Sequence, residues 1–327
     1  IRDSSVTGVQ TCALPICTMD HAHPVPLSGD PQAAGRLMRM ASIASMSVAT
    51  LLIVGKAAAW LATDSVAMLS SLIDSSLDLL SSMITFLAIR QALQPADAEH
   101  RFGHGKAEAL AGVAQAGFIA ASAGGLGLTV IDRYLHPRAL QAETVGVAVS
   151  AVAILFTLGL MWFQNYVVRR TGSLAVAADR AHYTTDFVTN IAVGIGLMAA
   201  ARLEQPLIDL GVALCVAVYL VVGAWSIGRT AIDVLMDREL PESDRKRILS
   251  LVGRHPSVRS THDLRTRSSG LTKFIQLHVV LEPTMSLGRA HIIGDSIQDE
   301  IQQAFPEAEI ILHIDPWNDH EPRTTKD

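Results

Sequence analysis

Charged residues and cysteines are scarce in this sequence. Asp, Glu, Lys and Arg make up 17% of the 327 residues, against roughly 25% in an ordinary globular protein. The formal net charge is −5, so the chain has no basic field that could hold nucleic acid. Three cysteines are too few for a disulfide framework or a four-cysteine zinc site. With a mean hydropathy of +0.33, this composition argues against a disordered, fibrous or simple soluble protein.

The opening segment differs from the rest because it has no apolar periodicity and holds two of the three cysteines. It begins with Ile1 and is typical of translated adapter or vector sequence. We therefore expect residues 1–18 to be non-native read-through, with Met19 as the native start. A genuine disordered tail is the alternative interpretation. In both cases we expect residues 1–37 to be a disordered N-terminus without a function.

Six long apolar stretches follow, and each is long enough to cross a membrane. A helix needs about 20 residues to cross a hydrocarbon core of about 30 Å. Apart from closed barrels, only helices satisfy their own backbone hydrogen bonds there. We therefore expect residues 38–236 to form an all-α transmembrane bundle of six helices. The stretches are residues 39–62, 66–92, 107–133, 143–168, 174–201 and 206–235.

The composition becomes densely charged from Asp237 onward. Amphipathic and alternating patterns there predict the order αββαβ, which is typical of a small α+β domain similar to metallochaperones and ferredoxins. We expect this soluble domain to cover residues 237–318 and a polar tail to cover residues 319–327. The predicted elements are helices over 241–254 and 287–304 and strands over about 259–267, 273–282 and 308–314.

Basic residues near the helix ends indicate the orientation in the membrane. Seven lie on one side if the N-terminus is inside, and three lie on the other side. Because Lys and Arg accumulate on the cytoplasmic side, we expect both termini and the soluble domain in the cytoplasm. The first group is Arg36, Arg39, Arg90, Arg101, Lys106, Arg169 and Arg170, and the second is Arg133, Arg138 and Arg202.

Two apolar stretches carry ionisable pairs deep in the membrane. Asp74 and Asp78 are four residues apart, and so are His182 and Asp186, so each pair shares one helix face. Carboxylates about 12–18 Å into a span are costly unless they face a polar interior, where they usually mark an ion path. Three carboxylates and one imidazole suit tetrahedral zinc and tolerate other divalent metals. Buried, hydrogen-bonded polar pairs without a metal are the alternative.

Two further groups could bind metal outside the membrane. Asp97, His100 and His104 lie together between the second and third stretches, although a solvated polar loop would have the same composition. Strands from different parts of a sheet can bring distant residues together, but scattered surface histidines remain the alternative for the soluble domain. The candidates there are His262, His278, His291, His313 and Asp315.

Five segments together resemble one family. From about residue 38 to residue 316 the chain resembles the cation diffusion facilitators, and in particular the bacterial ferrous-iron and zinc efflux pump type. The segments are LIDSSLD (72–78), QPADAEHRFGHGKAE (94–108), AHYTTD (181–186), HDLRTR (262–267) and LHIDP (312–316).

The resemblance implies a homodimer in the bacterial inner (plasma) membrane that exports divalent metal in exchange for protons. It implies a transport site formed by Asp74, Asp78, His182 and Asp186. It further implies a loop site at Asp97, His100 and His104, and a cytoplasmic site at His262, His278, His291, His313 and Asp315. Lys106 and Asp237 match residues that form interlocking salt bridges in the dimer near the membrane surface.

Two positions depart from the family pattern. Ile314 stands where such a pump can offer a side-chain amide between two cytoplasmic ligands, so one contact there is in doubt. Ala181 replaces a larger apolar residue before His182, which would loosen a hydrophobic gate.

We conclude from the sequence that the chain is a transporter, not an enzyme. Zinc is the expected cargo, and iron, cadmium, cobalt and manganese remain open because three carboxylates make a hard site. Its expected partners are a second copy, the lipid bilayer, metal ions and protons, without nucleic acid. Two rival hypotheses are an intramembrane hydrolase with paired aspartates and a metal sensor anchored by its helices. The first lacks a nucleophile elbow or a His-Glu-x-x-His helix, and the second has no use for ligands at midmembrane depth.

Overall fold

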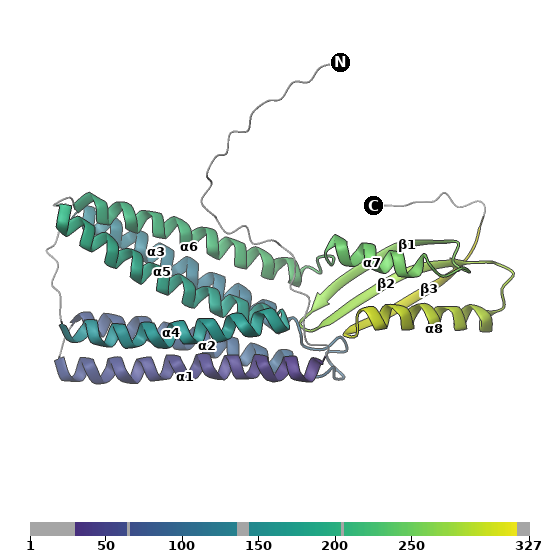
Figure 1. Ribbon diagram of the computed structural model, residues 1–327, viewed down its shortest axis with the longest axis horizontal. Helices are drawn as coiled ribbons and strands as arrows, with labels where there is room; N and C mark the ends of the chain where they lie inside the picture. Colours follow the sequence, from purple (N-terminus) through teal and green to yellow (C-terminus); the bar gives the residue numbers. More distant parts are fainter. Residues whose placement is uncertain (1–29, 64–65, 136–143, 204–205, 319–327) are drawn as a thin grey trace, which may run out of the picture.

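The computed structural model describes residues 30–63, 66–135, 144–203 and 206–318. The predicted read-through segment and the C-terminal tail lie outside the described residues. Six long helices run side by side as a bundle, and a small sheet domain lies beyond one end of it (Figure 1). The helices are α1 Pro31–Thr63, α2 Val66–Ala92, α3 Ala107–Leu135, α4 Thr144–Thr171, α5 Leu174–Leu203 and α6 Pro206–Leu235.

The first helix begins seven residues before the predicted start of the bundle at residue 38. The Asp30 carboxylate accepts the backbone N–H of Gln32 at 2.9 Å and so caps the helix. Pro31 follows as the first helical residue, where a missing N–H costs nothing. Residues 31–37, which we expected to be disordered, are therefore helical, and Ala34 is buried among them, as is Met38 directly after them.

Five of the six helices are individually apolar enough to cross a membrane within the described residues, namely α1, α2, α3, α4 and α6. The exception, α5, is as long as the others but carries Asp179, Arg180 and Asp186 in its first half. It packs against α3, α4 and α6, so the helix with the most ionisable groups lies inside the bundle. This arrangement agrees with the predicted six-helix transmembrane region.

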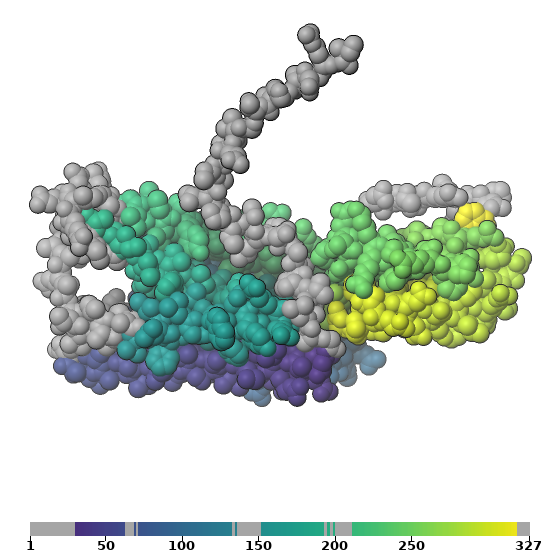
Figure 2. Space-filling view, in the orientation of Figure 1, coloured from purple at the N-terminus to yellow at the C-terminus, as the bar shows by residue number. Residues whose placement is uncertain are grey.

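Large apolar side chains cover much of the outer surface of the bundle. Trp162, Trp225 and Leu128 are each at least 70% exposed, and they belong to the elongated helical body that lies beside the sheet domain in Figure 2. A soluble protein rarely shows so much contiguous apolar surface. The surface therefore fits contact with lipid chains.

The C-terminal domain has the predicted order αββαβ. Strand β1 pairs with β2 in antiparallel fashion, and β2 pairs with β3 in parallel fashion. Alternate residues of β2, including Ile275, Leu277 and Val279, form one apolar core with Ile248 and Ile297 from the two helices. The opposite face of β2 carries Gln276 and His278 between the buried Phe274 and Val280. The elements are α7 Glu242–Val252, β1 Ser260–Ser269, β2 Thr272–Leu281, α8 Leu287–Ala304 and β3 Ala308–Pro316.

Candidate metal centres

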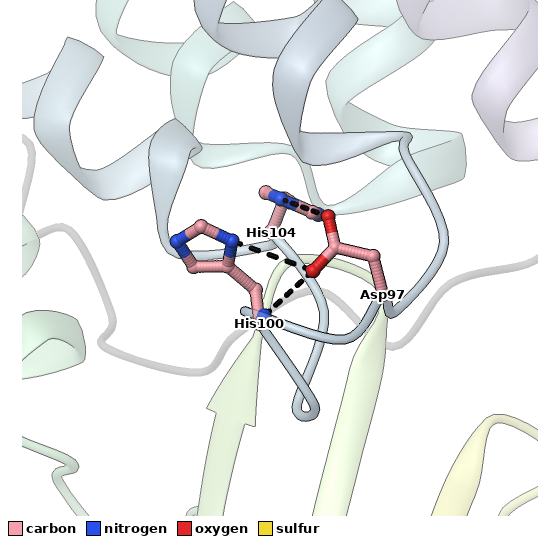
Figure 3. A group of neighbouring side chains, drawn as sticks. All are labelled: Asp97, His100 and His104. Carbon is pink, nitrogen blue, oxygen red and sulfur yellow. Dashed lines mark hydrogen bonds and ion pairs between the residues drawn. The ribbon is translucent and has the colours of Figure 1, made fainter.

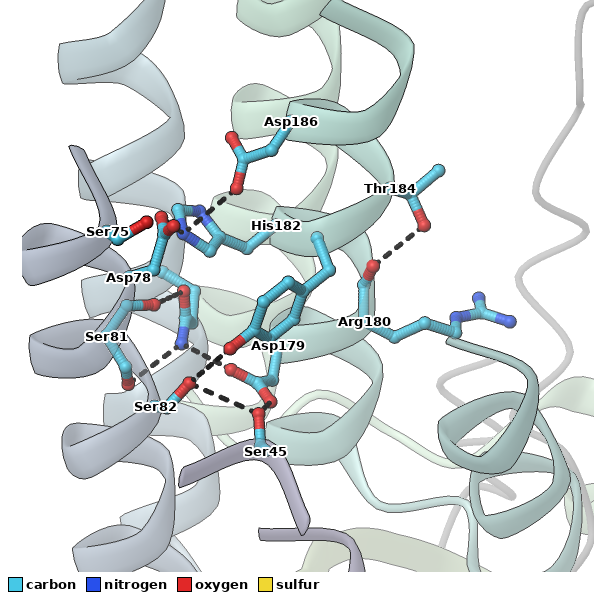
Figure 4. Close-up of polar contacts among 12 residues, drawn as sticks. Ser45, Ser75, Asp78, Ser81, Ser82, Asp179, Arg180, His182, Thr184 and Asp186 are labelled. Atoms are coloured by element: carbon cyan, nitrogen blue, oxygen red, sulfur yellow. Dashed lines mark hydrogen bonds and ion pairs between the residues drawn. The ribbon is translucent and has the colours of Figure 1, made fainter. Parts of the chain in front are cut away.

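The deepest candidate centre lies between α2 and α5. The Nε2 atom of His182 is 3.4 Å from Asp78 Oδ1 and 3.4 Å from Asp186 Oδ2. Figure 4 shows Asp78 approaching the imidazole from α2 while Asp186 approaches it from the next turn of α5. The four-residue spacing on α5 puts His182 and Asp186 on one face. The contact with Asp78 depends on how α2 packs against α5.

The buried atoms of this group lack hydrogen-bond partners. Both ring nitrogens of His182 and the Oδ2 atom of Asp186 have none within the described part of the chain. Native proteins rarely leave buried polar atoms unsatisfied. Ligand atoms about 2.1 Å from a tetrahedral zinc lie about 3.4 Å from one another, which is the spacing observed here. The three side chains therefore fit a small divalent cation.

Asp74, the fourth predicted member, lies outside this compact group. Asp78, His182 and Asp186 offer ligand atoms within 4.8 Å of one another, whereas Asp74 is exposed one turn away on α2. Residues four apart on a helix have Cβ atoms about 5–6 Å apart. A change of the Asp74 rotamer or a small rotation of α2 would be needed to complete a four-ligand set.

A second buried carboxylate, which the sequence analysis missed, lies one turn from His182. Asp179 is 1% exposed and accepts hydrogen bonds from Ser45 Oγ at 2.6 Å, Gln164 Nε2 at 2.7 Å and Gln115 Nε2 at 3.3 Å. These donors come from α1, α4 and α3, so one carboxylate ties four helices together. Its spacing of three residues from His182 could have indicated that it shares the same helix face.

The hydroxyls of two more residues extend this polar cluster. Ser82 on α2 lies 3.2 Å from Ser45 Oγ and 2.9 Å from the Tyr183 hydroxyl (Figure 4). Ser45 and Ser82 are fully buried. Since α5 begins at the end of the bundle near the sheet domain, the cluster closes the interior on that side of His182.

A lysine on α1 also lies near the residues of the predicted transport site, and the sequence analysis missed it. The Nζ atom of Lys56 donates to Ser75 Oγ at 2.6 Å and to the backbone oxygen of Ser71 at 3.2 Å. Its charge interacts through space with Asp78, Asp74 and Asp186. A cation inside an apolar span is rare and usually functional, so Lys56 was visible in the sequence as a candidate.

The predicted loop site is assembled between α2 and α3. Asp97 Oδ1 lies 3.5 Å from His100 Nδ1, and Asp97 Oδ2 lies 3.5 Å from His104 Nε2 (Figure 3). Backbone N–H groups of His100 and Glu99 donate to the carboxylate and lower the pKa of Asp97. The buried Nδ1 atom of His104 has no partner within the described residues. An ionised carboxylate between two imidazoles suits zinc.

The loop that carries this site packs directly on the sheet domain. A Cβ atom at Gly105 would lie 2.3 Å from the backbone oxygen of Ser269, so only glycine permits this approach. The Arg267 guanidinium lies 4.9 Å from the centre of the Phe102 ring and 4.7 Å from that of Phe274, within the range of cation–π attraction. The loop and the sheet therefore form one continuous junction.

The cytoplasmic site is built by the register of the sheet. His262 on β1 pairs with His278 on β2, which in turn pairs with His313 on β3. Asp315 Oδ2 lies 2.8 Å from His278 Nδ1 and 3.4 Å from His262 Nε2, and Asp315 Oδ1 lies 3.2 Å from His313 Nε2. Sequence spacing alone does not show this row of three imidazoles around one carboxylate.

One carboxylate at the edge of this row was not predicted. Asp263 Oδ2 lies 3.8 Å from His278 Nε2. The backbone of Asp263 adopts a left-handed φ of 51°, at the irregularity of β1 between His262 and Arg265. Asp237 also has a positive φ, of 58°. A hydrogen bond from Arg265 lowers the pKa of Asp263.

The structure does not bring His291 into the row of imidazoles. His291 lies on α8 with a largely exposed side chain, and its Nε2 atom is 3.6 Å from Asp295 Oδ2. Because α8 packs on the face of β2 opposite to His278, His291 lies apart from the row of imidazoles. The prediction that these five residues bind metal, with two neighbouring ions plausible per protomer, stays a prediction; the structure brings four of the five together and leaves His291 apart.

The two departures from the family pattern lie in apolar surroundings. Ile314 packs against the core of the sheet domain, and its Cδ1 atom would lie 3.1 Å from a Cβ atom at Gly294 on α8. It therefore points away from the imidazoles, so its identity does not remove a side-chain ligand here. Ala181 packs against an apolar cluster of α3, α5 and α6.

Lys106 and Asp237 meet where the bundle joins the sheet domain. The Nζ atom of Lys106 is 2.9 Å from Asp237 Oδ1 and donates to the backbone oxygen of Leu235 at 3.1 Å. Slight burial opposes ionisation of Asp237, but the hydrogen bond and charge of Lys106, together with Arg267, lower its pKa overall. The salt bridge forms within one chain.

Comparison with known proteins gives one consistent family. The sequence model described as the cation efflux transmembrane domain matches residues 42–236, and the one described as the cation efflux protein cytoplasmic domain matches residues 240–317. A cation-efflux pump FieF from Klebsiella pneumoniae is 42% identical over 289 residues, which cover 87% of this chain and 95% of the relative. The pump of the same name from Cronobacter sakazakii is 43% identical over 282 residues, covering 86% and 94%.

Two solved structures are similar to about a quarter of this chain. The zinc form of CzrB is 26% identical and covers 26% of this chain and 99% of that chain, with a TM-score of 0.25. The copper form of the MamM CTD is 21% identical and covers 25% and 90%, with a TM-score of 0.23. The two domain matches and the full-length relatives confirm the resemblance found in the sequence: the chain belongs to the cation efflux family, the cation diffusion facilitators, and is a membrane transporter of divalent metal cations, not an enzyme.

Proposed function

We propose that the chain exports zinc from the cytoplasm in exchange for protons, through a transport site formed by Asp78, His182, Asp186 and Asp74. The observation that carries this proposal is the buried His182 imidazole. Its Nε2 atom lies 3.4 Å from both Asp78 and Asp186, and neither ring nitrogen has a hydrogen-bond partner among the described residues. Three carboxylates and one imidazole bind zinc and also accept iron, cobalt, manganese or cadmium.

The exposure of the site supports alternating access. Asp179 is 1% exposed and His182 is 4% exposed, whereas the Asp186 side chain, further along α5, is 32% exposed. The site is thus closed toward the sheet domain and more open toward the far end of the bundle. In this conformation the metal would leave to the far side, and the polar cluster around Asp179 would have to separate before metal could enter from the cytoplasm.

Proton coupling follows from the chemistry of the ligands. Carboxylates and imidazole bind metal only when deprotonated, so metal and protons compete for the same atoms. Alternating exposure of one such site on opposite sides of the membrane exchanges one cation for the other. The exchange needs no further cofactor.

We further propose a regulatory role for the cytoplasmic site in a homodimer. His262, His278 and Asp315 would bind one ion, and His313 could share a second ion with Asp315. Ions that bind the folded dimer better than free chains stabilise it by mass action. The first residue of α1 lies at the same end of the bundle as the sheet domain, which supports cytoplasmic placement of both termini in a bacterial inner membrane.

Reconstitution in liposomes tests this function. Zinc uptake by inside-out protein should be faster with an outwardly directed proton gradient and should slow as the common pH falls below about 6, where protons occupy the ligands. A panel of zinc, iron, cobalt, manganese and cadmium would rank the cargo. Flux that ignores both pH and gradient would show a channel or another counter-ion.

A further inference from the structure

Lys56 lies beside the carboxylates of the proposed transport site. It lies on α1, which contributes none of the transport-site residues, and its side chain is half-buried. Its Nζ atom bonds Ser75 Oγ at 2.6 Å, and Ser75 lies on α2 between Asp74 and Asp78 in sequence. The ammonium group is therefore beside the carboxylates without being among the ligands.

The Lys56 side chain does not extend to the membrane surface. Lys56 lies seven residues before the end of α1, or about 10 Å from that end. The hydroxyl that it bonds lies nine residues after the start of α2, or about 14 Å from the same side of the bundle. The other acceptor, the Ser71 carbonyl, lies five residues after the start of α2. A snorkelling lysine extends toward water, whereas the Lys56 ammonium group stays at about the depth of its own backbone, between these two acceptors on α2.

The partners of the ammonium group leave its charge available. Both of its hydrogen bonds within the described residues go to neutral oxygens, the Ser75 hydroxyl and the Ser71 carbonyl. The carboxylates of Asp78, Asp74 and Asp186 act on it through space. Its flexible four-carbon stem lets the charge move without a change in the backbone.

We propose that Lys56 is a tethered competitor of the metal: its ammonium group weakens metal binding at Asp78, His182 and Asp186 and compensates the carboxylates after the ion leaves. A transporter must release its cargo on every cycle, and a fully uncompensated set of carboxylates would hold a divalent ion too tightly. A fixed positive charge nearby repels the bound ion and lowers the cost of the empty site. This inference rests on the proposed function because it requires those residues to bind the metal.

The test measures zinc flux by the full-length chain in liposomes over a range of zinc concentrations. Lys56→Met removes the charge and keeps most of the side-chain volume. We expect its half-saturating zinc concentration to fall about tenfold, which corresponds to about 1.4 kcal/mol, with a fall in the maximum rate because release becomes slower. Lys56→Arg keeps the charge and should lie between the parent and Lys56→Met.

A second variant separates competition from a structural role. Ser75→Ala removes the hydroxyl that holds the ammonium group, so the charge should move toward the carboxylates and raise the half-saturating zinc concentration. If Lys56 merely ties α1 to α2, Ser75→Ala and Lys56→Met should instead change the half-saturating zinc concentration in the same direction. That result, or a half-saturating concentration in Lys56→Met that is unchanged or raised, would overturn the proposal. If Lys56→Met does not fold, the sign of the Ser75→Ala effect decides alone.

The same experiment distinguishes failure of this inference from failure of the proposed function. Parental flux in Asp78→Ala would remove the transport site itself, whatever Lys56 does. Loss of flux in Asp78→Ala together with parental kinetics in Lys56→Met would refute the role of Lys56 alone.

Discussion

Replacing Asp78 by alanine should abolish metal flux while leaving the protein folded. Asp78 is the residue of α2 in the compact group, and its Oδ1 atom lies 3.4 Å from His182 Nε2. That separation is too long for a strong hydrogen bond, and the side chain is partly exposed, so its loss removes little stability. The same carboxylate supplies one of three closely spaced ligand atoms, so its loss should strongly weaken metal binding.

A lower limit can be set on the loss of zinc affinity in Asp78→Ala. Removing a residue that only supports a metal ligand typically costs 10- to 100-fold in affinity. Loss of a ligand should exceed 100-fold, or about 2.8 kcal/mol. At a zinc concentration that half-saturates the parent, fewer than a few per cent of Asp78→Ala molecules would then carry an ion, and flux should fall to background.

Zinc uptake into inside-out vesicles, with the amount of folded protein measured by size-exclusion chromatography, provides the assay. Ser76→Ala is the matched control because Ser76 is exposed on the same helix and its hydroxyl bonds only the Leu72 carbonyl among described residues. The control should transport like the parent. Near-parental flux in Asp78→Ala, with the control also active, would remove Asp78 from the transport site.

Three further predictions concern regulation and stability. His278→Ala should reduce the zinc-induced rise in melting temperature and slow transport without stopping it, because the transported ion uses other ligands; zinc binding equal to that of the parent in calorimetry would contradict this. Lys106→Met should destabilise the protein by at most about 1 kcal/mol at pH 7, since the pair with Asp237 is largely exposed. Because Lys106 lowers the pKa of Asp237, this contribution is present above about pH 4 and is lost as pH falls through the lowered value. The difference in melting temperature between parent and variant should therefore narrow in acid, and a difference that does not narrow would rule out the ion pair as its cause. Gln164→Ala removes a 2.7 Å donor from the buried carboxylate of Asp179 and should cost about 1.5–3 kcal/mol, seen as a lower melting temperature in detergent; an unchanged melting temperature would mean that the cluster does not stabilise the bundle.

The local pattern of the sequence was enough to predict the elements of the fold. Apolar runs of about 20 residues or more predict helices because the backbone in lipid must satisfy itself. Alternation around His278 predicts a strand because successive side chains point to opposite faces. The same reasoning placed Asp74 with Asp78 and His182 with Asp186 on shared helix faces. It failed at residues 31–37, where the cap from Asp30 starts the helix early.

Contacts between elements depend on packing, which local periodicity does not contain. Only the packing of α2 against α5 brings Asp78 to His182, and only that of α1 brings Lys56 beside them. The hydrogen bonds that surround Asp179 come from residues up to 134 positions away along the chain. Sequence spacing could place Asp179 on the face of His182, but it could not show which donors would meet it.

The sheet domain separates most clearly what the sequence determines from what only the tertiary structure decides. The sequence by itself determined which residues of the domain could bind metal, because imidazole and carboxylate are the chemistry that zinc requires. Strand register decided that His262, His278 and His313 lie in one row. The pleat directed Ile314 into the core, and the docking of α8 on the opposite face separated His291 from that row. These outcomes follow from pairing and packing between distant segments, so only the tertiary structure could decide them.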